Sequence, residues 1–163
     1  MTESGPPPNP NNESFLPLST VLIVDDNPQN VELLAAFVES LPVKIVTASD
    51  GIEALRKVAE HNPDLILLDI MMPHMSGFQV CQRIKSDPKT RDIQILMVTA
   101  LNELGDIERA TECGTDDFVS KPVNKVELLT RVKSLLRVRH LKSELERALT
   151  YLNEMEQDVA EGE

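Results

Sequence analysis

Short apolar runs alternate along the chain with longer segments in which apolar residues recur every three or four positions. The runs are rich in β-branched residues and too short for helices, so we expect buried strands at 21–24, 43–48, 65–68, 93–98 and 117–119. The longer segments predict helices at about 28–38, 51–61, 76–85, 105–113 and from Asn124 onward. Strands that are apolar on both faces and alternate with helices are typical of a parallel sheet covered on both sides. The pattern therefore predicts a doubly wound α/β fold of five strand–helix repeats.

Two of these helices carry a clear apolar face that should meet the sheet. In the helix at 51–61, this face is expected to carry Ile52, Leu55 and Val58. In the last helix, the residues expected to pack on the sheet are Val126, Leu129, Val132 and Leu136.

The last helix is predicted to run well beyond the sheet, because 124–159 contains neither proline nor glycine. Its outer half places apolar residues alternately three and four positions apart, at Val138, Leu141, Leu145, Ala148, Leu152, Met155 and Val159. This heptad seam favours a coiled coil, whereas the alternative is an amphipathic helix that folds back onto its own domain. We therefore divide the chain into a proline-rich disordered leader (1–18), one domain (19–137) and a helical extension with a frayed acidic end (138–163).

Polar residues follow four of the five predicted strands. The first strand ends in Asp25-Asp26, the third in Asp69 and the fourth in Thr99, while Lys121-Pro122 follows the fifth. In an open parallel sheet, the functional site lies at the carboxyl ends of the strands. The sequence thus predicts that these residues meet in one crevice.

Three carboxylates in one crevice repel one another, which a bound cation would relieve. Oxygen ligands without thiol or imidazole partners suit Mg²⁺, and Mn²⁺ as an alternative. Asp69 can act as a nucleophile toward phosphorus, and Lys121 and Thr99 can contact phosphoryl oxygens. The residue types therefore indicate metal-assisted phosphoryl transfer.

Composition narrows the class of protein. The formal net charge of −11 argues against direct nucleic-acid binding. No apolar stretch approaches the roughly 20 residues that cross a bilayer, and the first residues do not form a secretory signal. We therefore expect a cytoplasmic protein without membrane insertion, in which Cys81 and Cys113 are reduced structural thiols.

Taken together, the motifs resemble the receiver domains of bacterial two-component response regulators over roughly 19–137. The matching segments are the apolar run ending in Asp25-Asp26, Leu-Leu-Asp69-Ile-Met-Met-Pro73 followed by Ser76-Gly77, Val98-Thr99-Ala100, and Phe118-Val-Ser-Lys121-Pro122. The resemblance implies a flavodoxin-like sheet of five parallel strands in the order 2-1-3-4-5, with five helices of which the last is extended.

The same resemblance assigns the phosphoacceptor and the metal ligands. Asp69 would take the phosphoryl group from a sensor histidine kinase or a phosphotransfer protein. Mg²⁺ would be held by Asp26, by Asp25 directly or through water, by Asp69 and by the backbone carbonyl of Met71. Apart from this self-phosphorylation and a slow autodephosphorylation, no enzymatic activity is expected.

A switch is also implied by the resemblance. Thr99 and Lys121 would move toward the phosphoryl group, and the Lys121–Pro122 peptide bond would be cis. Phe118 would turn inward into space that Thr99 vacates and the small Ala100 leaves open. The signal would leave through the helix at 105–113, the fifth strand and the last helix.

Two neighbouring positions bear on how long the phosphorylated state lasts. In this family, the residues two positions after the phosphoacceptor and two after the threonine flank the approach of hydrolytic water, and in this sequence they are Met71 and Leu101. Because both are apolar, we expect slow loss of the phosphoryl group.

The output is less defined by the sequence. We expect a homodimer through the last helix and an unknown downstream protein. The extended helix resembles receivers that feed cyclic-di-GMP regulators, whose catalytic half has no counterpart in this sequence. Two other hypotheses are a purely structural dimerisation pseudo-receiver and a phosphohydrolase. The second is disfavoured because Met71 stands where a second carboxylate would be needed.

Overall fold

The computed structural model of the 163-residue chain describes residues 16–100 and 104–162. Its strands are β1 (Ser19–Val24), β2 (Val43–Ala48), β3 (Leu65–Leu68), β4 (Gln94–Thr99) and β5 (Asp117–Ser120). Its helices are α1 (Pro28–Val38), α2 (Gly51–His61), α3 (Gly77–Ser86), α4 (Leu104–Cys113) and α5 (Lys125–Glu161). Ten predicted elements are thus confirmed, with β4 one residue later than expected. The leader predicted over 1–18 falls mostly outside the described residues, and Leu16 is buried in the core.

All strand pairs are parallel, and the sheet order is β2-β1-β3-β4-β5. This order confirms the flavodoxin-like arrangement expected from the resemblance. From β1 the chain continues to β2 on one side and then crosses to β3, β4 and β5 on the other side. The switch point of the sheet therefore lies between β1 and β3. The chain therefore opens a crevice at the carboxyl ends of these two central strands.

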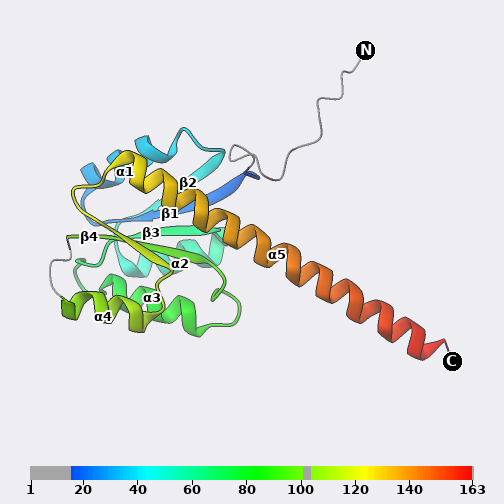
Figure 1. Ribbon diagram of the computed structural model, residues 1–163. Coiled ribbons are helices and arrows are strands. Elements are labelled where there is room, and N and C mark those ends of the chain that lie inside the picture. The colour runs from blue at the N-terminus through cyan, green and yellow to red at the C-terminus, as the bar shows by residue number, and fades with distance from the viewer. Residues whose placement is uncertain (1–15, 101–103, 163) are drawn as a thin grey trace, which may run out of the picture.

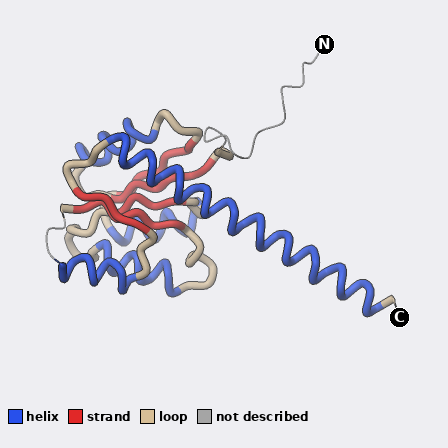
Figure 2. The backbone as a smooth tube through the Cα atoms, viewed as in Figure 1, coloured by secondary structure: helices blue, strands red, loops and turns tan. Residues whose placement is uncertain are grey.

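Helices cover both faces of the sheet and enclose two separate apolar cores (Figures 1 and 2). On one face, α2, α3 and α4 pack against the strands through residues such as Val58, Cys81 and Ala110. On the other, α1 and α5 contribute Leu34 and Val132, among others. Because β3 and β4 are buried along their whole length, they are fixed between the two layers.

The helices begin where the sequence supplies caps. The Asn27 side chain accepts a hydrogen bond from the backbone of Gln29, and Pro28 occupies the first turn of α1. Ser76 and Gln79 form a capping box at the start of α3. The caps fix the starts of α1 and α3, which lie next to the carboxylates at the ends of β1 and β3.

The structure corrects two predicted helix faces. Ile52 is 67% exposed, whereas Ala54 and Val58 of the same helix are buried. In α5, Val126 is exposed, and the buried row consists of Leu128, Val132, Leu135 and Leu136. The buried row of α2 is Gly51, Ala54 and Val58, one position before the predicted row at its start, whereas the buried row of α5 begins at Leu128, two positions after Val126.

α5 is one continuous helix of 37 residues that leaves the sheet and extends away from the domain (Figure 1). It does not fold back. Where it leaves, Ser19 Oγ lies 2.8 Å from His140 Nε2, and Arg139 Nε lies 3.4 Å from Asp64 Oδ1. Beyond this point the seam residues are exposed. Among the described residues, no helix is both long and apolar enough to cross a membrane.

Candidate functional site

The predicted site residues converge at the carboxyl ends of the parallel strands. Asp25 and Asp26 follow β1, and Asp69 follows β3. Because Val24 pairs in register with Leu68, these strands end level with each other. Ligand oxygens of the three carboxylates all lie within 4.8 Å of one another. The structure therefore brings together the acidic cluster that the sequence predicted.

Lys121 closes this cluster on the β5 side. Its Nζ lies 3.2 Å from Asp25 Oδ2 and 3.5 Å from Asp69 Oδ1. The backbone N–H of Lys121 donates to the Thr99 carbonyl at 2.8 Å, which places the lysine beside the end of β4. The Lys121–Pro122 bond is cis, as expected. The lysine thus stands between two carboxylates and offsets part of their negative charge.

Burial differs among the three carboxylates. Asp25 and Asp69 are buried, whereas Asp26 is exposed. Asp25 Oδ1 accepts a hydrogen bond from the backbone N–H of Asn27 at 2.9 Å, which holds this side chain in place. The cluster therefore has a fixed inner part and one carboxylate that faces solvent.

The electrostatic state of Asp69 reflects this crowding. Burial raises the pKa of the Asp69 carboxyl above its ordinary value of 3.8, and the charge of Asp25 raises it further. Lys121 and a hydrogen bond from the Met71 backbone act in the opposite direction. An additional positive charge in the cluster would favour the ionised, nucleophilic carboxylate.

The donor set fits a small, hard divalent cation. Three carboxylates offer oxygen alone, with no thiol or imidazole in the group. Their negative charge exceeds the single positive charge of Lys121, so a cation reduces repulsion among them. Met71 lies two residues after Asp69 and lines the cleft beside Asp26, so its backbone carbonyl is a candidate further ligand. Mg²⁺ satisfies these requirements best.

An open cleft of about 610 Å³ leads to the cluster. It is lined by Asp26, Met71, Thr99, Ala100 and Arg109, among others. The cleft thus connects solvent with the exposed carboxylate of the cluster, Asp26, and with the end of β4.

Two residues of the site were not identified as functional in the sequence. Arg109 of α4 lines the cleft, and its guanidinium carbon lies 4.6 Å from the centre of the Phe78 ring. No motif spacing in the sequence predicts that Arg109 lies at the cleft, because its position depends on how α4 packs against α3.

Gly77 belongs to the motif segment quoted from the sequence, and the structure shows that its role is steric. A Cβ there would overlap the Asp69 carbonyl oxygen and lie 2.8 Å from the Ile70 Cα.

The remaining predicted residues are placed as follows. Thr99 is buried at the end of β4, and Ala100 follows it at the cleft. Phe118 is 39% exposed, and Met71 is 76% exposed. Leu101 lies outside the described residues.

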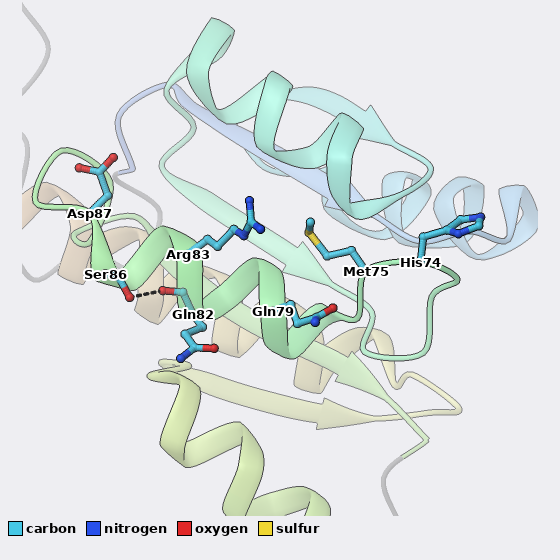
Figure 3. Close-up of a pocket in the computed structure, with 7 residues that line it drawn as sticks. All are labelled: His74, Met75, Gln79, Gln82, Arg83, Ser86 and Asp87. Carbon is cyan, nitrogen blue, oxygen red and sulfur yellow. Dashed lines mark hydrogen bonds between the residues drawn. The ribbon is translucent and has the colours of Figure 1, made fainter.

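A second groove, of about 790 Å³, runs along α3 (Figure 3). His74, Met75 and Arg83 help to line it, and it contains none of the predicted site residues. Because no carboxylate of the acidic cluster reaches this groove, we assign it no role in phosphoryl transfer.

The sequence matches the response regulator receiver domain over residues 21–133. The response regulator PleD of Caulobacter vibrioides is 45% identical over 125 residues, which are 77% of this chain and 28% of PleD. The polar-differentiation response regulator DivK of Brucella ovis is 37% identical over 117 residues, which are 72% of this chain and 95% of DivK. The chain thus spans less than a third of PleD and nearly all of DivK.

Solved structures give the same picture. The receiver domain of a histidine kinase from Syntrophus aciditrophicus matches with a TM-score of 0.69 and 37% identity, covering 73% of this chain and 90% of that one. The receiver domain of the sensor histidine kinase PA1611 from Pseudomonas aeruginosa, solved with a magnesium ion coordinated in its active-site cleft, matches with a TM-score of 0.67 and 29% identity, covering 72% of this chain and 97% of that one. The sheet order, the acidic cluster and these similarities show that this chain belongs to the response regulator receiver family of two-component signalling.

Proposed function

We propose that this chain is a phosphorylation-activated switch that accepts a phosphoryl group on Asp69 from a histidine kinase or a phosphotransfer protein. The observation that carries the proposal is the position of Asp69, which is 5% exposed yet lies within reach of a cation and two further carboxylates. Burying a carboxylate beside two others destabilises the fold, and ionisable groups in such surroundings are typical of functional sites.

The transfer uses groups that the chain itself supplies. An Asp69 carboxylate oxygen attacks phosphorus, the bond from phosphorus to the donor nitrogen breaks, and that nitrogen keeps the electron pair. Lys121, freed from part of its pairing with Asp25, contacts a phosphoryl oxygen. Asp25, Asp26, Asp69 and the Met71 carbonyl would hold Mg²⁺, which supplies the remaining charge neutralisation.

The conformational response follows from the new charge at Asp69. The Thr99 hydroxyl moves toward the phosphoryl oxygens, and Ala100 leaves room for this movement. Phe118 then turns inward from its partly exposed position on β5. Because α4, β5 and α5 share this side of the domain, their outer face changes and carries the signal.

The extension over 138–163 is the second part of the proposal. Its seam residues Leu141, Leu145, Leu152 and Met155 are exposed on the part of α5 that extends away from the domain (Figure 1). A heptad seam of this kind is buried by a second copy of the same helix. We therefore assign homodimerisation to the extension and phosphoryl transfer to 19–137.

The test is the intact mass of the full chain after incubation with acetyl phosphate and Mg²⁺. One phosphoryl adduct is expected, which disappears with a chelator or in Asp69→Asn. Asp64→Asn is a matched control, since Asp64 lies away from the cluster, and it should keep the adduct. No adduct on the wild-type chain would favour the structural pseudo-receiver. Steady turnover of a chromogenic phosphate ester would favour the phosphohydrolase.

A further inference from the structure

The two cysteines of the chain, 32 residues apart in sequence, meet between two helices. Cys81 lies in the middle of α3, and Cys113 is the last residue of α4. Both are free thiols, and the Cys81 thiol donates a hydrogen bond to the Cys113 carbonyl oxygen at 3.3 Å. The Cys113 thiol in turn donates a hydrogen bond to the Ala110 carbonyl oxygen at 3.0 Å, within its own helix. The sequence predicted reduced structural thiols, and the structure has both cysteines free and places them side by side between α3 and α4.

Their access to solvent is unequal. Cys81 is fully buried in the core beneath α3, whereas Cys113 is partly exposed. Cys113 also lines a small groove of about 190 Å³ between α3 and α4, together with Phe78, Arg109 and Glu112. A small oxidant can therefore reach the Cys113 sulfur first, while Cys81 lies behind it.

The surroundings of Cys113 favour its thiolate. The adjacent Cys81 thiol is the main cause that lowers the pKa of the Cys113 thiol to about 7, and Lys85 contributes a smaller effect. The Lys85 ammonium is held nearby by Asp116 at 2.8 Å and by the Ile93 carbonyl at 2.8 Å. The adjacent Cys113 thiol and burial raise the pKa of the Cys81 thiol. One sulfur is thus prepared as the nucleophile and the other as the resolving thiol.

We propose that Cys113 and Cys81 form a peroxide-sensitive pair that closes into a disulfide between α4 and α3. Cys113 is the last residue of α4 and is followed by Gly114 in a left-handed conformation (φ +89°). No further helical turn therefore fixes the backbone after Cys113. Such a position leaves room for the small adjustment that bond formation requires.

The chemistry balances with hydrogen peroxide as the oxidant. The Cys113 thiolate attacks one peroxide oxygen, the O–O bond breaks, and hydroxide leaves, which gives a sulfenic acid. The Cys81 thiol then loses its proton, its sulfur attacks the Cys113 sulfur, and the S–O bond breaks to release water. In total, two thiols and one peroxide give one disulfide and two waters.

The disulfide would act on the switching face. It would tie the end of α4 to α3, whereas the phosphorylation response requires α4 to shift. The thiol chemistry itself does not involve Asp69, so it can succeed or fail independently of the proposed phosphoryl transfer.

The experiment treats the full chain with hydrogen peroxide and measures free thiols, intact mass and the disulfide-linked peptides. We expect loss of both thiols, a mass decrease of two hydrogens, a Cys81–Cys113 linked peptide, and full reversal by dithiothreitol. In Cys81→Ala, the Cys113 sulfenic acid should persist and be trapped by dimedone. In Cys113→Ser, Cys81 should stay reduced.

Several results would overturn the proposal. They are a disulfide between two chains in place of one within a chain, oxidation of Cys113 to a sulfinic acid while Cys81 remains a thiol, or no reaction under conditions that oxidise both cysteines of the unfolded chain. The peptide map is made on the wild-type protein, so the outcome does not depend on whether the buried Cys81→Ala variant folds well.

Discussion

The ammonium group of Lys121 lies 3.2 Å from an oxygen of the buried Asp25 carboxylate. It also lies 3.5 Å from Asp69, so a single cation is shared between two acidic groups. This sharing keeps Lys121 close to Asp69, the proposed phosphoacceptor. Under the proposed function, the positive charge needed after transfer is therefore already present in the resting state.

Replacing this lysine should impair phosphorylation without unfolding the domain. In Lys121→Ala, Asp69 loses a neighbour that lowers its pKa, and the phosphoryl oxygens lose their ion-pair partner. We expect the rate of adduct formation from acetyl phosphate to fall at least about tenfold. Lys125→Ala, an exposed lysine at the start of α5, is the control and should react like the wild type. Equal rates for both variants would remove Lys121 from the mechanism.

The raised pKa of Asp69 gives a prediction about stability and pH. Between the ordinary value of 3.8 and the higher folded value, the folded protein binds more protons than the unfolded chain, so stability falls as pH rises through this window. Without divalent metal, Asp69→Asn should therefore be more stable than the wild type at pH 7, and the difference should shrink as pH is lowered through the window. Urea unfolding in the presence of a chelator measures this. A less stable Asp69→Asn at pH 7 would contradict the electrostatic account.

The close approach of α3 behind Asp69 predicts a strict requirement for glycine at position 77. Gly77→Ala would force its Cβ into the Asp69 carbonyl and the Ile70 backbone, which cannot yield as a flexible side chain would. We expect a loss of roughly 1–3 kcal/mol in the free energy of unfolding and slower phosphorylation. Gly162→Ala, near the end of α5, is the control and should change neither quantity. A Gly77→Ala variant as stable as the wild type would show that the loop adapts freely.

The exposed Met71 side chain at the cleft predicts a long-lived phosphorylated state. It is apolar and offers no group to orient a hydrolytic water near Asp69. We expect slow autodephosphorylation, followed by intact mass after removal of the phosphodonor, and faster loss in Met71→Asn. A half-life of seconds for the wild type would refute this prediction.

The exposed seam of α5 predicts a concentration-dependent dimer. Leu145→Glu together with Leu152→Glu places charges on the seam, and the dimer should dissociate in sedimentation equilibrium. Thr150→Glu, on the opposite side of the helix, should leave it intact. A wild-type chain that is monomeric at all concentrations would remove dimerisation from the proposed function.

The elements and the site were largely predictable, because short apolar runs and the polar residues at their ends depend on local sequence. The buried faces of α2 and α5 were not fully predictable, since Ile52 and Val126 fit the helical period but are exposed to solvent. The Cys81–Cys113 pair and the position of Arg109 were equally out of reach. They depend on how α3 packs against α4, and no spacing along the chain encodes that packing.

The most direct test of the central claim is to locate the phosphoryl group on the chain. Borohydride reduces an aspartyl phosphate to homoserine, which peptide sequencing by mass spectrometry identifies at a single position. After reaction with acetyl phosphate and Mg²⁺, we predict homoserine at position 69 and unmodified aspartate at positions 25 and 26. Homoserine at position 25 or 26, or at none of the three, would contradict the assignment of Asp69 as the phosphoacceptor.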